Sequence, residues 1–349
     1  MAYTEIDDPS AYFQTALFTG TGGSHSITNT GNSDLQPDWV WVKSRSFVAD
    51  HELFDSVRGT GVALISNGNY AESSGRGVNS FDSDGFSIVN AQAATNTSGE
   101  TYAAWQWKAG TSFTNDASGT GIGTIDSAGS VSTAAGFSVI SYTGNGSAGA
   151  TVAHGLGSTP KMIIVKRRNA SSSWKVYHAS VGANYAGYLN TTGIFDEEIY
   201  PWNNTSPTSS VFSLGTTPET NGSGATLIAY CFADVQGYSK FGSYIGNGNA
   251  DGKFVYTGFK PAFVMIKSSS NSGQAWVMQD NKRDGFNYNN HRLFANSSGA
   301  EESTVRMDLL SNGFKCRDND GNGNGFTYIY MAFASSPFTT SSGVPTTAR

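Results

Sequence analysis

The stretch Pro160-Lys161-Met162-Ile163-Ile164-Val165-Lys166 decides the fold, because the chain contains two further segments of the same design. These are Pro37-Asp38-Trp39-Val40-Trp41-Val42-Lys43 and Pro261-Ala262-Phe263-Val264-Met265-Ile266-Lys267. Each segment begins with proline, ends with lysine six residues later and carries four consecutive apolar residues between them. A pattern that returns at a regular spacing predicts a repeat protein.

Each of these segments has the pattern of a buried strand. Proline fixes φ and has no N–H to donate, so it suits the first residue of a strand. Successive residues of a strand face opposite sides, which places Trp39, Trp41 and Lys43 on one face and Val40 and Val42 on the other. Because both faces are apolar, we expect a central strand covered by the opposing sheet on one side. On the other side we expect a neighbouring repeat, loop or subunit.

The recurrent lysine has two interpretations. It can contact a shared ligand, or it can extend over the apolar side chains at the strand end and meet a carboxylate or carbonyl. The second interpretation is favoured, because lysine commonly buries its methylene stem while its ammonium finds polar partners.

Two further anchors flank the signature segment in every repeat. One is an aromatic-x-Gly-x-Gly motif at 18–22, 142–146 and 244–248, and the other is an aromatic strand at 102–107, 227–232 and 328–333. The signature lysine precedes the last aromatic residue by 64, 66 and 66 positions, a nearly constant spacing that supports a triplication. The glycine pair lacks the third glycine and the helix of a dinucleotide site, so it predicts a turn or bulge at the end of an edge strand.

Composition and strand spacing predict an all-β fold of three tandem β-sandwich repeats, jelly-roll or lectin-like, of about 100 residues each. The 42 glycines and the low charged fraction of 14% are typical of a protein with many turns. We expect repeats at 1–108, 136–236 and 237–338, a Gly/Ser/Thr-rich linker with at most one short strand pair at 109–135, and a tail at 339–349.

Charge and cysteine usage exclude several classes of protein. A net charge of -6 without long Lys/Arg clusters argues against a duplex nucleic-acid surface. The sequence has no apolar run of about 18 residues, and the acidic N-terminal stretch is unlike a signal peptide, so we expect no membrane span and a protein made in a cytoplasm. The two cysteines, Cys231 and Cys316, have no metal-type spacing and are expected as free thiols, although a single bridge stays open.

Several motifs resemble the tandem β-rich domain of tail-fibre and other virion structural proteins of marine bacteriophages, including those of cyanobacteria. The motifs that carry the resemblance are 142–146, 154–157, 160–168, 174–178, 229–232, 238–244 and 328–330, and it extends from Tyr12 to Phe338. It implies a non-enzymatic virion protein, assembled in the host cytoplasm, without a cofactor. Its implied partners are other virion proteins and copies of itself, most often as a trimer. The first repeat matches more loosely, which leaves it free to serve as an attachment or assembly module.

Two alternatives to a tail fibre stay open. The first is a head fibre or capsid decoration protein built from the same domain. The second is a depolymerase, which needs a pair of carboxylates across a sugar site. The candidate carboxylates are Asp196, Glu197, Glu198, Glu301 and Glu302, but none recurs in another repeat, so we do not expect an enzyme. The chain also lacks heptad repeats, which favours a compact tip, collar or adaptor over a shaft.

One loop of the second repeat is a candidate glycan site. Tyr200 and Trp202 can stack on sugar rings, while Asn203 and Asn204 can hydrogen-bond hydroxyl groups of a host-surface glycan. The alternative, which we favour, is that the aromatic side chains lie under their own loop or in a subunit contact.

A second candidate is a calcium loop in the third repeat. Asp318, Asp320 and Asn322 match the first ligand positions of such a loop, but its twelfth position is Ile329 instead of the bidentate glutamate. A simple Asp/Asn/Gly hairpin loop is the favoured interpretation.

Overall fold

The computed structural model describes residues 3–303, 307–318 and 321–346 of the chain. Antiparallel strands make up nearly all of the regular structure in these residues, with only two short α-helices and one 3-10 turn. The prediction of an all-β fold is therefore confirmed.

The strands fall into three units along the chain, with a short segment between the first and the second. The first unit contains η1 (Pro9–Ala11), β1 (Phe13–Thr19), β2 (His25–Ile27), β3 (Trp39–Ser44), β4 (Glu52–Asp55), β5 (Leu64–Ile65), β6 (Val78–Asp82), β7 (Gly85–Ile88) and β8 (Thr101–Trp107). The connecting segment contains β9 (Thr111–Asn115), α1 (Ala117–Thr120) and β10 (Ser127–Ser132).

The second and third units follow without a comparable insertion between them. The second contains β11 (Phe137–Thr143), β12 (Ala150–Ala153), β13 (Met162–Arg167), β14 (Lys175–His178), β15 (Tyr185–Tyr188), β16 (Asp196–Glu197), β17 (Val211–Leu214), α2 (Pro218–Asn221) and β18 (Thr226–Phe232). The third contains β19 (Ser239–Ile245), β20 (Phe254–Tyr256), β21 (Phe259–Ser268), β22 (Val277–Asp280), β23 (Leu293–Phe294), β24 (Met307–Leu310), β25 (Gly313–Cys316) and β26 (Thr327–Pro337).

One strand order occurs in all three units. The large sheets run β1-β8-β3-β4-β5, β11-β18-β13-β14-β15 and β19-β26-β21-β22-β23. In each, the signature segment supplies the middle strand, as its apolar faces predicted. Pro37 and Pro160 precede β3 and β13, whereas β21 begins at Phe259 and accommodates Pro261 at a register shift in its ladder with β26. A proline fits there because a bulge leaves one residue of the strand unpaired.

A small sheet covers one face of each large sheet, so that each unit is sandwich-like. The small sheets are β2-β7-β6, β12-β17 and β20-β25-β24. Val40 and Val42 of β3 lie in the core between the two sheets of the first unit. The alternating residues Trp39 and Trp41 belong to a different core, which all three units share.

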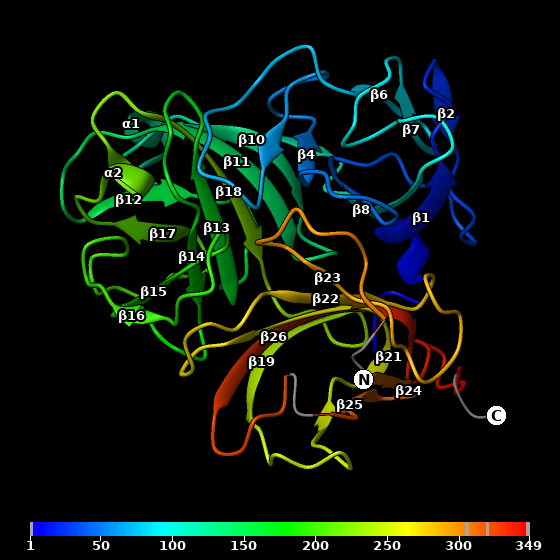
Figure 1. Cartoon of the computed structure of the whole chain (residues 1–349). Coiled ribbons are helices and arrows are strands. Elements are labelled where there is room, and N and C mark those ends of the chain that lie inside the picture. The colour runs from blue at the N-terminus through cyan, green and yellow to red at the C-terminus, as the bar shows by residue number, and fades with distance from the viewer. Residues whose placement is uncertain (1–2, 304–306, 319–320, 347–349) are drawn as a thin grey trace.

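The shared core joins the three units at the centre of the molecule, around which their sheets are grouped in Figure 1. The ring of Trp39 stacks on Tyr230 of the second unit, with centroids 4.5 Å apart. Phe13 stacks on Phe333 of the third unit at 5.3 Å, and Phe232 contacts the same ring edge-on at 6.1 Å. The second apolar face of each signature strand is therefore covered by neighbouring units, as predicted.

The segment 109–135 widens the sheet of the second unit. β10 pairs with β11 and β9 pairs with β10, so the expected strand pair adds two strands to that sheet and makes it eight-stranded. Ile125, between α1 and β10, is buried in the core of the second unit. The segment has the polar composition of a linker because one face of the sheet that it extends is in contact with solvent.

The glycine pairs are needed for close packing of a loop. A Cβ on Gly144 would lie 2.5 Å from the carbonyl oxygen of Gly222, and Gly146 has a φ of +73°. Asn221 holds this loop, because its side chain accepts from the Asn145 N–H and donates to the Ser147 carbonyl, both at 2.9 Å. These contacts explain the motif without a bound phosphate.

Cys231 and Cys316 are free and buried. Within the described residues, no helix has the length and apolar character needed to cross a membrane.

Candidate functional site

The three signature lysines are buried and connect the units. Lys43, Lys166 and Lys267 are at most 1% exposed. Each ammonium donates to one carbonyl of its own unit and to one of another unit. The acceptors in the same unit are Ser44 (2.8 Å), Ser172 (2.7 Å) and Gln274 (2.6 Å), and those in another unit are Ser298 (3.3 Å), Asn69 (3.4 Å) and Thr192 (3.2 Å).

These contacts form a closed cycle, in which the first unit donates to the third, the second to the first and the third to the second. Burial lowers the pKa of each of the three lysines to about 8. The prediction that these lysines meet a carboxylate or a carbonyl is confirmed, and the acceptors are carbonyls. Lysine recurs at this position because each of the three joins its own unit to another.

A second set of contacts between units begins at the residues just before β14 and β22. The indoles of Trp174 and Trp276 donate to the carbonyls of Ile65 and Tyr188, at 2.8 and 2.9 Å, and each of these carbonyls lies in the preceding unit. His51 takes the same position in the first unit. Burial lowers the pKa of His51 well below its ordinary value, an effect that the backbone of the third unit partly opposes.

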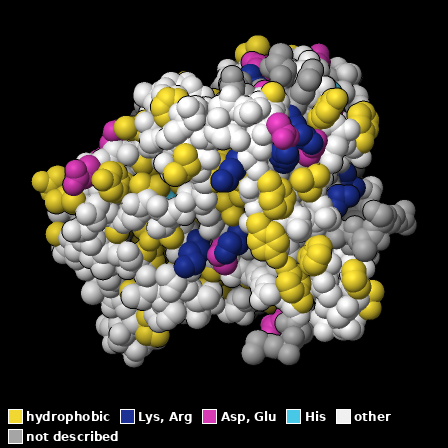
Figure 2. Space-filling model, turned by 90° about the horizontal axis from the view of Figure 1, so that it is seen from below, with side chains coloured by type: hydrophobic (Ala, Val, Ile, Leu, Met, Phe, Trp, Pro, Cys, Tyr) yellow, Lys and Arg dark blue, Asp and Glu magenta, His cyan; other side chains and the backbone are white. Residues whose placement is uncertain are grey.

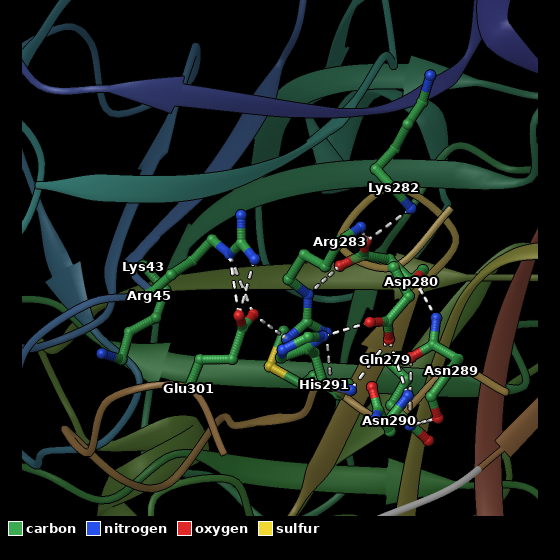
Figure 3. A network of polar contacts seen from close by, with 12 residues as sticks. Lys43, Arg45, Gln279, Asp280, Lys282, Arg283, Asn289, Asn290, His291 and Glu301 are labelled. Carbon is green, nitrogen blue, oxygen red and sulfur yellow. Dashed lines mark hydrogen bonds and ion pairs between the residues drawn. The ribbon is translucent and has the colours of Figure 1, made fainter. Parts of the chain in front are cut away.

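A network of charged side chains, shown in Figure 3, joins the first and third units. Asp280 and Arg283 form an ion pair of 2.6 Å, and neither side chain is exposed. Trp105 of the first unit donates its indole N–H to Asp280 at 3.0 Å. Glu301 lies between Arg283 and Arg45, at 3.0 and 2.8 Å. Burial alone would raise the pKa of Asp280, but Arg283 lowers it below its ordinary value.

The first and second units have a similar junction. Asp55 and Arg58 form a fully buried ion pair of 2.6 Å, and the hydroxyl of Tyr230 donates to Asp55 at 2.7 Å. Arg168 of the second unit reaches Glu72 of the first at 2.8 Å. The buried charges of both junctions are therefore used to hold units together.

Most of the candidate catalytic carboxylates are also paired. Glu198 contacts Lys175 at 2.5 Å and accepts from the Tyr188 hydroxyl at 2.8 Å, while Glu301 lies in the network of Figure 3. The half-exposed Glu302 contacts the largely buried Arg292 at 2.9 Å. Asp196 and Glu197 are exposed in β16, at the edge of the large sheet of the second unit.

A hollow of about 530 Å³ along β10 and β11 contains one carboxylate, Asp126, among hydroxyl and aliphatic side chains. The part of the chain that the structure describes contains no group of three His, Cys, Asp or Glu side chains that could hold a metal ion.

The four predicted glycan-binding residues are only partly on the surface. Trp202 is 2% exposed and packs edge-on against Tyr177, so it does not offer its ring to a ligand. Tyr200, in contrast, is 64% exposed. Asn203 and Asn204 adopt left-handed φ values of 51° and 48°, which asparagine tolerates better than most residues. Of the two aromatic residues, Tyr200 alone is available for stacking.

The predicted calcium loop is described only in part. Asp320 lies outside the described residues, and Asp318 is half-buried two residues after the end of β25. Asn322 is fully buried and equivalent to Asn221 in the second unit: it accepts from the Asn247 N–H at 3.1 Å and donates to the Asn249 carbonyl at 2.9 Å. The side chain of Asn322 therefore holds the Gly-x-Gly loop, and calcium binding stays a prediction.

Exposed aromatic side chains gather around the small sheet of the third unit. Among the described residues nine Phe and Tyr side chains are exposed, and five of them, Phe254, Tyr256, Phe286, Tyr288 and Phe338, belong to this region. Together with Tyr3 we call them the aromatic patch. Figure 2, which views the molecule from below, shows apolar side chains gathered on the side where β24 and β25 lie in Figure 1.

The patch borders both edges of the small sheet. On β20, the exposed Phe254 and Tyr256 alternate with a buried valine. Tyr3 donates its hydroxyl to the Gly258 carbonyl at 2.5 Å, and its ring contacts Phe338 edge-on at 6.3 Å.

At the opposite edge of the sheet, a loop side chain attaches the remaining two aromatic residues to β24. The Asn287 side chain accepts from the Leu309 N–H at 2.9 Å and donates to its carbonyl at 3.1 Å. Because Asn287 stands between Phe286 and Tyr288, this contact brings both of them beside β24.

Comparison with known proteins identifies a family. A model of a domain of unknown function, DUF7483, matches residues 8–337. The chain belongs to the DUF7483 family. Neither the curated proteins nor the solved structures gave a match to it.

The small sheets show where this DUF7483 chain differs between its units. The outer face of the first unit's sheet is polar: Ser26 hydrogen-bonds Ser87 at 2.8 Å, and Ser87 donates to Asp82 at 2.6 Å. Phe254 and Lys315 occupy the corresponding cross-strand pair in the third unit. Sequence reasoning missed the aromatic patch, although two aromatic residues flanking one valine in a short strand were a visible signal.

Proposed function

We propose that this chain is a non-enzymatic bacteriophage virion protein, a compact component of a tail fibre or tail appendage with a role in host-surface contact. The resemblance of its motifs to marine phage fibre proteins supports the virion assignment. The observation that carries the proposal is the contrast between interior and surface: buried ion pairs accept hydrogen bonds across the junctions between units, while exposed aromatic side chains gather on one outer region.

Such an arrangement suits a rigid block that displays binding surfaces. Ion pairs, hydrogen bonds and aromatic contacts between units resist the domain movements that many enzymes use to close over a substrate. Exposed tyrosine and phenylalanine side chains are common anchors of interfaces because they bury a large area with few rotatable bonds. Tyr200 and the aromatic patch are two places that offer them.

Location in the particle tests the proposal. Mass spectrometry of purified virions is expected to detect the chain, and antibody labelling in electron micrographs is expected to place it on the tail. Label on the head would favour the alternative, a head fibre or decoration protein. A protein absent from purified virions would exclude both.

Glycan recognition is the second part of the proposal. The chain is expected to bind a host-surface glycan on an array, with Tyr200→Ala weakening the signal and the exposed Asn32→Ala as a control. A signal that survives Tyr200→Ala would remove the second-unit loop from the site. Release of sugar fragments from host polysaccharide by the purified chain would instead favour a depolymerase.

We further propose that copies of the chain associate in the particle, with a trimer as the favoured state. Sedimentation velocity on purified protein measures this directly. A monomer at all concentrations would contradict it.

A further inference from the structure

The first strand of the small sheet is equivalent in all three units, which allows its surroundings to be compared. In each unit an aliphatic residue of this strand lies opposite a buried phenylalanine: Ile27 opposite Phe86, Val152 opposite Phe212 and Val255 opposite Phe314. The corresponding strands are β2, β12 and β20.

In the second unit the outer edge of this strand is covered by the chain itself. The N–H groups of Thr124 and Ile125 donate to the Thr151 carbonyl at 2.9 and 3.1 Å. The Thr151 N–H donates in return to the Thr124 hydroxyl at 2.8 Å. Further along, the Ser127 hydroxyl donates to the Ala153 carbonyl at 2.9 Å. An extended segment therefore satisfies the backbone groups that β12 turns outward.

The covering segment also contributes a side chain to the core. Ile125 forms a parallel bridge with Val152, and its side chain is 7% exposed within the hydrophobic core of the second unit. The segment belongs to the insertion at 109–135, for which the third unit has no counterpart between β18 and β19. An added segment thus covers this strand edge in the second unit but not in the third.

In the third unit the same edge is open among the described residues, because β20 has only β25 as a sheet neighbour. The Thr257 N–H donates across this ladder to the Asn312 carbonyl at 3.0 Å. Since backbone groups alternate in direction along an antiparallel strand, those of Phe254 and Tyr256 point away from β25. Phe254 and Tyr256 are the equivalents of Thr151 and Ala153 in the second unit.

The open edge of β20 also has side chains suited to a partner. The Phe254 and Tyr256 side chains are 41% and 58% exposed, and the Tyr3 hydroxyl already contacts the Gly258 carbonyl just beyond the end of the strand. In the first unit, Ser26 takes the place of Phe254 and offers no aromatic surface. Exposed strand edges are templates for pairing with another chain, and aromatic side chains beside them add buried area.

We propose that β20 is a docking edge for an extended segment of a partner protein, which adds to it as a parallel strand. The segment that covers β12 in the second unit defines the chemistry of this partner. The partner has a serine or threonine followed by a β-branched aliphatic residue, as Thr124 and Ile125 are placed beside β12. Main-chain hydrogen bonds to Phe254 and Tyr256 supply the pairing, and the aliphatic side chain turns inward toward Val255. This inference goes beyond the proposed function and does not depend on a virion location.

A probe peptide with the sequence of residues 122–128, Ile-Gly-Thr-Ile-Asp-Ser-Ala, tests the proposal on the full chain. It is added free, and in a second protein it is fused ahead of Tyr3 through a flexible linker, which raises its effective concentration beside β20. Amide hydrogen exchange followed by NMR is expected to slow about tenfold or more at Phe254 and Tyr256. A peptide with aspartate at the position of Ile125 is expected to give no protection.

Two proline substitutions serve as a matched pair. Phe254→Pro removes an outward N–H without breaking the ladder to β25, so the fold is expected to survive while protection of Tyr256 is lost. Ser26→Pro, at the equivalent place on β2, is expected to leave the protection intact. Thermal unfolding of both variants checks that each is folded.

Four results would overturn the proposal. In the first, the fused peptide leaves amide exchange at Phe254 and Tyr256 unchanged. In the second, the peptide protects the Ser26 amide and not those of Phe254 and Tyr256. In the third, the Phe254 and Tyr256 amides already exchange slowly in a monomer without peptide. The fourth is concentration-dependent protection accompanied by a dimer in sedimentation, which would make a second copy of this chain the occupant.

Discussion

At the scale of single residues, the last residue of β4, β14 and β22 makes a contact between units in each case. Asp55 and Asp280 hold this position in the first and third units, each with its own arginine three residues later. His178 stands there in the second unit, where its Nε2 faces the Tyr330 carbonyl of the third at 3.3 Å. Different side chains thus make the same kind of contact to the next unit.

Removing one partner of a buried pair tests this role. Arg283→Met leaves Asp280 ionised, buried and unpaired, which is expected to cost about 3–5 kcal/mol of the free energy of unfolding. Lys240→Met removes the half-exposed contact to Asp234, and its cost is expected to be about 0–1 kcal/mol. Urea unfolding of both variants measures the difference. Equal costs would show that the buried pair does not stabilise the junction.

The buried histidines predict a loss of stability in acid. Burial lowers the pKa of His154 and of His178 from 6.5 to about 4, so the unfolded chain binds more protons between these values. Stability is therefore expected to fall as pH drops from 6.5 to 4, by about 2 kcal/mol for each histidine. His178→Gln should flatten this part of the profile measured by urea unfolding at several pH values. An unchanged profile would assign the acid sensitivity to other groups.

At the scale of elements, the Gly-x-Gly loop and its distant asparagine form one structural device. The asparagines 96, 221 and 322 each hold such a loop from about 75 residues away in the chain, as their hydrogen bonds show. The glycines permit the close approach, and the amide supplies the hydrogen bonds that the turn leaves unmade. The first glycine and the asparagine therefore depend on each other.

Asn221→Ala is expected to leave the Asn145 N–H and the Ser147 and Gly215 carbonyls without their partner. The cost is expected to be about 1–3 kcal/mol, because buried polar groups lose their hydrogen bonds. The exposed Asn32→Ala should change stability by less than about 0.5 kcal/mol. Thermal denaturation compares the two, and an Asn221→Ala protein as stable as its parent would contradict this account of the motif.

At the scale of the whole molecule, the three units share one core and cannot be separated without exposing it. The outward side chains of the middle strands, such as Trp39, Ile164 and Phe263, belong to a single cluster drawn from all units. A unit on its own would expose this apolar face to water. It would also lose the hydrogen bonds that its buried lysine and its carbonyl groups make with the other units.

We therefore expect one cooperative unfolding transition for the full chain. The isolated second unit, residues 109–236, is expected to lack the near-ultraviolet circular dichroism of packed aromatic rings. Scanning calorimetry of the full chain and spectroscopy of the fragment check both points. Separate transitions, or a fragment with native-like spectra, would show that the units are independent domains.

The sequence by itself determined the all-β class, the central position of the signature strand and the burial of both its faces, because proline, alternation and repeated spacing are local signals. It also indicated that the lysine meets a carboxylate or a carbonyl. The tertiary structure alone decided that the acceptors are carbonyls and which ones they are, since each acceptor in the neighbouring unit is distant in the chain.

The candidate sites show the same division. Tyr200 and Trp202 look alike in sequence, yet one is exposed and the other is buried against Tyr177, because loop packing depends on contacts with distant strands. The open edge of β20 is likewise invisible in sequence. It emerges only when the covered edge of β12 shows what an equivalent strand can bind, since pairing between strands is a property of the folded chain.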